Sequence, residues 1–133
     1  MSQDLIAKVQ ELYAAFGRGD IPAVLEGMTD DVDWGIESVV QEVPWYGLLK
    51  GRTSTLKFFQ GLGEGADFHV FNPHSFVTAG DQVFNLLQYE ATMKRSGKRV
   101  ATTSMQHWTF RNGKVAQWRS YEDTARIRDA YKG

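Results

Sequence analysis

The sequence contains no cysteine, which excludes disulfide bonds and thiolate metal sites. Small secreted domains commonly depend on disulfides, so this absence favours a cytoplasmic protein. No apolar run approaches the roughly 20 residues that a membrane-spanning helix needs, and the N-terminus lacks a secretory signal pattern. We therefore expect no membrane partner.

An excess of positive charge is also missing. The 15 basic and 16 acidic residues are mixed along the chain and give a net charge of −1. Proteins that bind nucleic acid usually concentrate Lys and Arg on one face to neutralise phosphates. The balance of charge therefore argues against a nucleic-acid partner.

The chain is rich in aromatic residues, with 4 Trp, 5 Tyr and 8 Phe among 133 residues. Such side chains line cores, ligand pockets and interfaces alike. The length suits one domain over residues 1–133, and it allows a core that needs neither disulfides nor a structural metal.

Apolar residues recur at helical spacing in three segments of the first half. The first covers residues 5–16 and the second follows an N-cap at Asp20. We expect Asp30-Asp31 to end this second helix. The third begins near Thr53 and ends in the glycines of residues 61–65.

Strand patterns dominate the rest of the chain. Residues 37–50 have no clear period and are predicted to form a loop. Pro73 indicates an edge strand or a bulge, and a terminal helix follows Asp123. The predicted strands cover residues 32–36, 68–78, 82–95, 98–111 and 114–122. Helices followed by a strand meander predict an α+β domain with a long antiparallel sheet.

Five strings, taken in order, resemble the nuclear transport factor 2-like superfamily, in its SnoaL-like and ketosteroid isomerase-like branch. They are Gly19-Asp20, Asp30-Asp31-Val32-Asp33-Trp34, Leu49-Lys50-Gly51-Arg52, the segment from Trp108 to Val115, and Tyr121-Glu122-Asp123-Thr124-Ala125. The resemblance implies a cone, in which a curved antiparallel sheet wraps around three N-terminal helices and encloses a central pocket. It also implies a homodimer formed through the outer face of the sheet.

Strand periodicity predicts which side chains face the pocket. If Ser96-Gly97 is a two-residue turn, Tyr89 lies opposite Ser104 and Leu87 lies opposite Gln106. The shared face then carries Asn85, Leu87, Tyr89, Ala91, Ser104, Gln106 and Trp108. The resemblance turns this face inward and puts Gln106 where the isomerases have a hydrogen-bonding aspartic acid. Glutamine can donate to an oxyanion but cannot supply a proton.

Two registers are open for the last strand. A two-residue turn at Asn112-Gly113 would turn Gln117, Arg119 and Tyr121 inward. A three-residue loop with a glycine bulge would instead turn Trp118, Ser120 and Glu122 inward. The resemblance favours the second register.

Glu122 is then the main candidate for catalysis. Burial in an apolar cavity raises the pKa of a carboxyl group, which can then act as an acid or base near neutral pH. A solvated carboxylate at a strand end is the alternative. The neighbouring Asp123 is explained by helix capping alone.

Tyr13 lies within one residue of the isomerases' oxyanion tyrosine and is a second catalytic candidate, or else a core aromatic. Ile36 stands where those enzymes carry their proton-shuttling carboxylate, and Glu37 is one residue away. A one-residue step turns a strand side chain to the other face, so we do not expect the ketosteroid reaction itself.

Four aromatic residues are expected to bind an apolar ring system, or else to fill the cone. They are Trp34, Tyr89, Trp108 and Trp118. His74, near the rim, is a candidate proton carrier and substrate contact. The three histidines are not spaced to converge on one ion, so we expect no metal site.

Together these patterns favour an enzyme of the isomerase, cyclase or hydrolase type that uses no cofactor. Its substrate would be a small apolar or carbonyl-bearing molecule, and Glu122, Gln106 and Tyr13 would manage proton transfer. The alternative is a non-catalytic module of the same fold that binds a hydrophobic ligand or dimerises. In that case Phe84, Leu86 and Met105 would form an outer interface, joined by Trp118 if the last strand adopts the first register.

Overall fold

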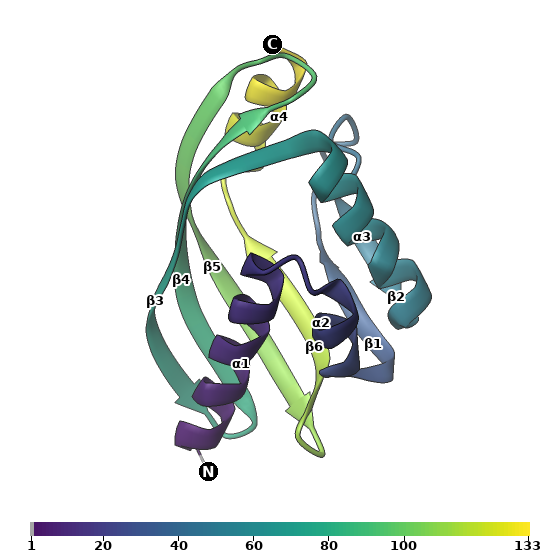
Figure 1. Cartoon of the computed structure of the whole chain (residues 1–133), viewed down its shortest axis with the longest axis vertical. Coiled ribbons are helices and arrows are strands. Elements are labelled where there is room, and N and C mark those ends of the chain that lie inside the picture. Colours follow the sequence, from purple (N-terminus) through teal and green to yellow (C-terminus); the bar gives the residue numbers. More distant parts are fainter. Residues whose placement is uncertain (1) are drawn as a thin grey trace.

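A curved sheet covered on its inner face by helices forms the fold of this chain (Figure 1). The computed structural model describes residues 2–133. Within this range the helices are α1 (Ser2–Gly17), α2 (Ile21–Glu26), α3 (Gly51–Gly65) and α4 (Thr124–Lys132). The strands are β1 (Met28–Ile36), β2 (Gly47–Lys50), β3 (Ala66–Ala79), β4 (Gln82–Met93), β5 (Arg99–Arg111) and β6 (Lys114–Tyr121). The predicted α+β class is confirmed.

Helices α2 and α4 begin at the residues that the sequence indicates. The carboxylate of Asp20 accepts a hydrogen bond from Ala23 N at the start of α2, and that of Asp123 accepts one from Arg126 N at the start of α4. The short α2 ends at Glu26, so the chain enters β1 before it reaches Asp30-Asp31. Among the described residues, no helix is long and apolar enough to cross a membrane.

The strand order is β2-β1-β6-β5-β4-β3, and the sheet does not close. Four of the five strand pairs are antiparallel, as predicted. The exception is β1, which runs parallel to β6 and places Trp34 beside Trp118. The sheet is therefore mixed. The parallel pair joins β1, which precedes the meander in the chain, to β6, which ends it.

One strand lies in a segment predicted to be a loop. Residues 47–50 form β2, which pairs with the end of β1 through Leu49 and Trp34. A four-residue strand has too few positions for a period to show. Its end leads directly into α3, which begins at Gly51 rather than near Thr53.

The edge position predicted from Pro73 is confirmed. β3 is the last strand of the sheet, and Pro73 pairs with Leu87 without interrupting it. The register of β3 shifts between Phe68 and Val70 and again between His74 and Val77. Proline is tolerated here because an edge strand leaves one row of backbone donors unused.

The pairing of β4 with β5 differs from the prediction by two residues. Leu87 lies opposite Ser104 and Asn85 lies opposite Gln106, because the turn contains residues 94–97 instead of two residues. A shift of two leaves every side chain on its predicted face. Asn85, Ser104 and Gln106 are accordingly buried on the inner face.

The last strand turns Trp118 and Ser120 inward, as in the second predicted register, but without the predicted three-residue loop. Asn112 and Gly113 form a two-residue turn in which both have positive φ, 53° and 78°. Val115 pairs with Phe110 and Gln117 pairs with Thr109, so Ala116 is an extra residue that forms a bulge. Beyond this bulge Trp118 and Ser120 are buried on the inner face, opposite Trp108 and Gln106.

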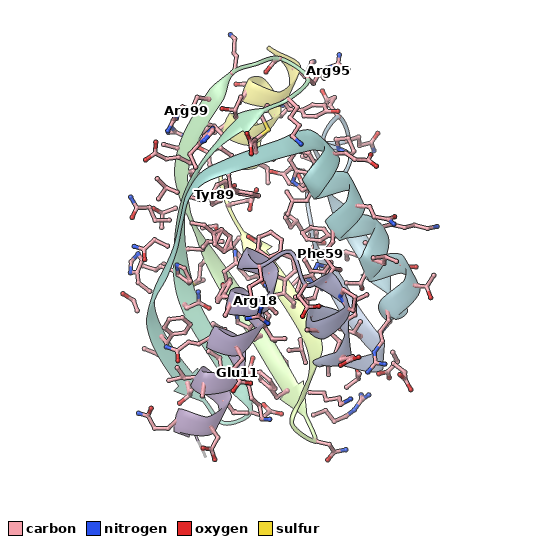
Figure 2. All side chains as sticks on the ribbon, viewed as in Figure 1. Glu11, Arg18, Phe59, Tyr89, Arg95 and Arg99 are labelled. Atoms are coloured by element: carbon pink, nitrogen blue, oxygen red, sulfur yellow. The ribbon has the colours of Figure 1, made fainter. Side chains whose placement is uncertain are left out.

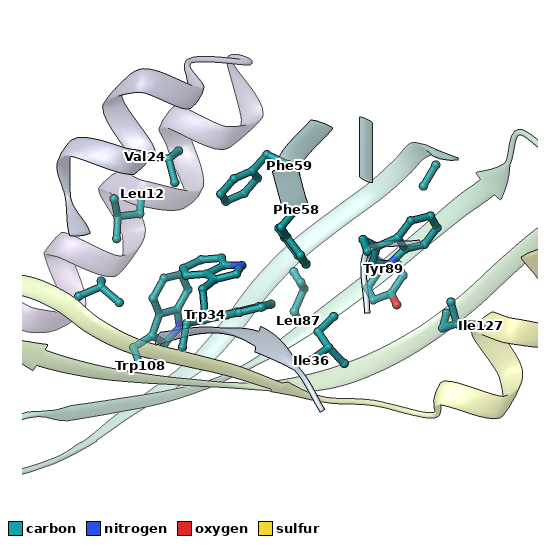
Figure 3. Close-up of a cluster of buried hydrophobic side chains, with 14 of the residues drawn as sticks. Leu12, Val24, Trp34, Ile36, Phe58, Phe59, Leu87, Tyr89, Trp108 and Ile127 are labelled. Carbon is teal, nitrogen blue, oxygen red and sulfur yellow. The ribbon is translucent and has the colours of Figure 1, made fainter. Parts of the chain in front are cut away.

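The core fills the space between the helices and the sheet. Figure 2 shows Phe59 of α3 and Tyr89 of β4 in this interior, whereas Arg95 and Arg99 lie at the end of the molecule near α4. In Figure 3, Leu12 and Val24 approach from α1 and α2, and Trp34 and Trp108 approach from the sheet. The helices and the sheet thus form opposite walls of one apolar interior.

Candidate functional site

The interior contains a cavity of about 90 Å³. Its walls come from α1, α2 and α3 on one side and from β1, β3, β4, β5 and β6 on the other. Seven of the residues predicted for the site line this cavity: Tyr13, Trp34, Tyr89, Gln106, Trp108, Trp118 and Glu122. The fold therefore brings together side chains from the first helix and the last strand.

The indole rings form one side of the cavity. Trp34 stacks on Trp118, with ring centroids 4.2 Å apart and planes inclined by 18°. Trp108 meets Tyr13 edge to face at 5.4 Å. These contacts hold the rings in fixed orientations, so they provide flat apolar walls.

Glu122, directly after β6, brings a carboxylate to this apolar lining. Tyr46 Oη donates a hydrogen bond to Glu122 Oε2 over 2.7 Å, and Ser120 Oγ donates to Oε1 over 2.9 Å. Tyr89 Oη is a third and weaker donor, 3.5 Å from Oε2. Burial raises the pKa of Glu122, and the three hydrogen bonds oppose part of that rise.

The two tyrosines beside Glu122 keep their protons. Burial raises the pKa of Tyr46 and of Tyr89, and the negative charge of Glu122 raises both further. Each hydroxyl group therefore remains a donor toward the carboxylate. The arrangement can hold Glu122 as an oriented base in its charged form.

Gln106 is held by hydrogen bonds on every side. Its Nε2 donates to Ser104 Oγ over 2.9 Å and to Ser120 Oγ over 2.8 Å. Its Oε1 accepts from Trp118 Nε1 over 3.0 Å. Both amide hydrogens are thus in use, and donation to a ligand oxyanion would require one of these bonds to break. As placed, Gln106 orients Ser120, and through it Glu122.

A second polar cluster lies at the other side of the cavity. Asn85 Nδ2 donates to Tyr13 Oη over 3.0 Å, and Asn85 Oδ1 accepts from Trp108 Nε1 over 3.0 Å. Burial raises the pKa of Tyr13. Among the described residues its own hydroxyl hydrogen meets no acceptor, so Tyr13 is free to donate to a ligand.

The structure does not bring His74 to the cavity. It lies opposite Leu86, on the outer face of the sheet, and its Nδ1 is 2.8 Å from Ser75 Oγ. The substrate contact predicted for it has no counterpart in the cavity lining. Similarly, Ile36 lines the cavity while Glu37 is exposed, as the one-residue step predicts.

Tyr46 is the site residue that the sequence did not reveal. It lies in the segment between β1 and β2, where a turn joins Tyr46 N to Val43 O. The only local signal is a pair of aromatic residues, Trp45 and Tyr46, in a stretch without period. Among the described residues, no group of three acidic or histidine side chains is arranged to hold a metal ion.

Known proteins share this fold. The family model of the SnoaL-like domain matches residues 9–118. An NTF2-like protein of unknown function from Burkholderia pseudomallei K96243 is 22% identical, with a TM-score of 0.90 and 98% of each chain covered. An NTF2-like protein from Burkholderia xenovorans LB400 is 25% identical, with a TM-score of 0.89 and the same coverage.

A third similar structure holds a small molecule. TerC, co-crystallised with polyporic acid, is 22% identical with a TM-score of 0.85, covering 98% of this chain and 99% of TerC. Among curated proteins, none has a sequence that matches this chain. The match over residues 9–118 and the shared cone of helices and curved sheet place this chain in the SnoaL-like domain family of the NTF2-like superfamily.

Proposed function

We propose that this protein is an enzyme that transfers a proton next to the carbonyl group of a small apolar ligand, using its own side chains. The observation that carries the proposal is Glu122. Its carboxylate lines an aromatic cavity, has a raised pKa and is oriented by Tyr46 and Ser120. A carboxylate in this setting suits general acid–base chemistry near neutral pH.

Tyr13 supplies the complementary group. Removal of a proton from the carbon beside a carbonyl moves negative charge onto the carbonyl oxygen. In the proposed step, Glu122 takes that proton while the free hydroxyl hydrogen of Tyr13 bonds to the oxygen. A positioned donor at the developing oxyanion lowers the barrier of such reactions. Isomerases, cyclases and some hydrolases share this step.

The cavity suits a ligand with a compact ring. Its volume of about 90 Å³ accommodates several waters or a single small ring. Small-ligand binding also agrees with TerC, whose structure contains polyporic acid. A one-ring ketone such as cyclohexanone is therefore a suitable probe.

The test is exchange of the α hydrogens of cyclohexanone for deuterium in D₂O, followed by NMR. We expect the wild-type protein to accelerate the exchange and the Glu122→Gln variant to lose about 100-fold or more of that acceleration. Glu90→Gln, on the outer side of β4, is the matched control and should keep the wild-type rate. Equal rates for wild type and Glu122→Gln would remove the proposal.

A non-catalytic binding module is the second candidate. The observation in its favour is that Gln106 and Asn85 satisfy their hydrogen bonds within the protein. In that case the cavity binds cyclohexanone, but α-hydrogen exchange stays at the buffer rate for every variant.

We also propose that two copies of the chain associate through the outer face of the sheet. Leu86, Met105 and Tyr121 are exposed there and lie opposite one another on β4, β5 and β6. Phe84, beside them, stacks on His107 with ring centroids 4.5 Å apart. A contiguous apolar stripe of this kind is typical of an interface between subunits.

A further inference from the structure

The wall of the cavity contains a buried N–H group for which no described residue provides an acceptor. Two buried side-chain atoms lack a partner among the described residues, Thr29 Oγ1 and Trp34 Nε1. Of these two residues only Trp34 lines the cavity. Trp34 is only 3% exposed, so bulk water does not supply the missing partner.

The neighbouring indoles show that an unpaired N–H is the exception in this cluster. Trp108 Nε1 donates to Asn85 Oδ1, and Trp118 Nε1 donates to Gln106 Oε1, both over 3.0 Å. Trp34 stacks on Trp118 and therefore has the same apolar surroundings. Since buried donors in native proteins are nearly always paired, an orphan on a cavity wall points to a partner that the protein chain does not provide.

The position of the ring indicates where that partner binds. Phe58 and Phe59 of α3 pack around Trp34, with ring centroids 5.8 Å and 5.4 Å away. In Figure 3 the edge of Trp34 that carries the nitrogen is turned toward Phe58, another residue of the cavity wall. Nε1 itself has almost no accessible surface beside Phe58, so a ligand oxygen reaches it only when the Phe58 ring turns aside. The face of an aromatic ring is a weak acceptor, so a carbonyl oxygen in its place would form a better hydrogen bond.

We infer that Trp34 is a specificity-determining residue that donates a hydrogen bond from Nε1 to an acceptor atom of the ligand. The inference rests on the cavity being the ligand site of the proposed function. It narrows the ligand to compact rings that carry a carbonyl or comparable oxygen acceptor. A hydrocarbon of the same shape leaves the N–H unpaired, and sites built around a hydrogen bond reject such analogues strongly.

Two ligands of nearly equal shape test this assignment. Cyclohexanone carries the acceptor, and methylenecyclohexane replaces its oxygen with a CH₂ group. In ¹⁵N-labelled wild-type protein, we expect the indole N–H proton of Trp34 to move downfield with cyclohexanone and to stay in place with methylenecyclohexane. This measurement needs no variant and no turnover.

Variants give the second readout. Trp34→Phe keeps an aromatic ring but loses the N–H, so it should bind cyclohexanone about five- to tenfold more weakly and methylenecyclohexane unchanged. Trp118→Phe is the matched control, because it removes an N–H that already bonds to Gln106. Its effect on the two ligands should be equal.

Three results would overturn the inference. They are an unmoved Trp34 resonance with cyclohexanone, equal weakening of both ligands by Trp34→Phe, and failure of both ligands to bind. The outcome is independent of catalysis, since binding is measured directly. A protein that binds cyclohexanone through Trp34 but exchanges no α hydrogens would contradict the proposed function alone.

Discussion

The hydroxyl group of Tyr46 donates a hydrogen bond to Glu122 Oε2 across 76 positions of sequence. Tyr46 directly precedes β2 and Glu122 directly follows β6, and these strands flank β1 in the sheet. The parallel pairing of β1 with β6 therefore brings the two residues to the same end of the sheet. Through this contact the segment before β2 orients the proposed base.

Replacement of Tyr46 by phenylalanine should shift the activity to higher pH. The hydrogen bond from Tyr46 favours the charged carboxylate, so its loss raises the pKa of Glu122 further. A base works when it is deprotonated, and the acidic limb of the rate profile should therefore move upward. The measurement is the rate of α-hydrogen exchange of cyclohexanone as a function of pH.

Tyr89→Phe is the comparison for this experiment. Tyr89 Oη lies 3.5 Å from the same carboxylate oxygen, against 2.7 Å for Tyr46. Its removal should move the profile in the same direction by a smaller amount. A larger effect of Tyr89→Phe, or an unchanged profile in Tyr46→Phe, would contradict the assignment of Tyr46 as the principal donor.

The stability of the protein should report the raised pKa of Glu122. Because that pKa lies above its ordinary value of 4.5 in the folded state, folding binds protons at this residue. The stabilising contribution is present at low pH and is lost as the pH rises through the folded pKa. Glu122→Gln should therefore gain free energy of unfolding relative to wild type between about pH 4 and about pH 8. Urea titrations of both proteins at these pH values measure the difference, and a constant difference would refute the expectation.

Gly35→Ala should destabilise the region that carries Tyr46. A Cβ atom at Gly35 would overlap the carbonyl oxygen of Gly47 and the Cα of Leu48, which are backbone atoms of β2. Forcing them apart weakens the β1–β2 pair, and we expect a loss of about 1–3 kcal/mol in thermal unfolding. Gly63→Ala in α3 is the control, since a Cβ there has open space, and it should stabilise by about 0.5–1 kcal/mol.

Met105→Lys should separate the proposed dimer. It places a charge at the centre of the exposed stripe between Leu86 and Tyr121, where burial against a second copy would be costly. We expect the wild type to sediment as a dimer and the variant as a monomer in analytical ultracentrifugation. Gln60→Lys adds the same charge at an exposed position of α3 and should leave the dimer intact. A monomeric wild type would refute the interface.

Much of the fold could be predicted because its elements have clear periods. The helices around Leu12 and Phe59 and the four strands of the meander follow from spacing alone. The strand β2 could not be predicted, because its four residues become a strand only by pairing with β1.

The faces of the strands were easier to predict than their registers. The turn between β4 and β5 is longer than predicted, yet an even shift kept Gln106 and Ser104 inward. The bulge at Ala116 is different, because a single step there reverses every later side chain of β6. Alanine is not a residue that marks a bulge, so only the family resemblance favoured the observed register.

The site was predicted only in part, because its hydrogen bonds join segments that are far apart in the sequence. Periodicity grouped the residues by face, and the family resemblance turned Gln106 and Glu122 inward. Neither could show that the hydroxyl groups of Ser104 and Ser120 occupy both amide hydrogens of Gln106. Tyr46 could not be paired with Glu122 before the order of the strands was known.

The parallel pair of β1 and β6 sets the order in which the molecule can be completed. Met28–Ile36 leaves the ribosome well before its partner Lys114–Tyr121, because the whole meander lies between them in the chain. Pairing at such sequence separation is slow, because a long loop must close before the contact forms. The stack of Trp34 on Trp118 and the placement of Glu122 can therefore form only after β6 has been synthesised, and until then the apolar side of β1 lacks its partner strand.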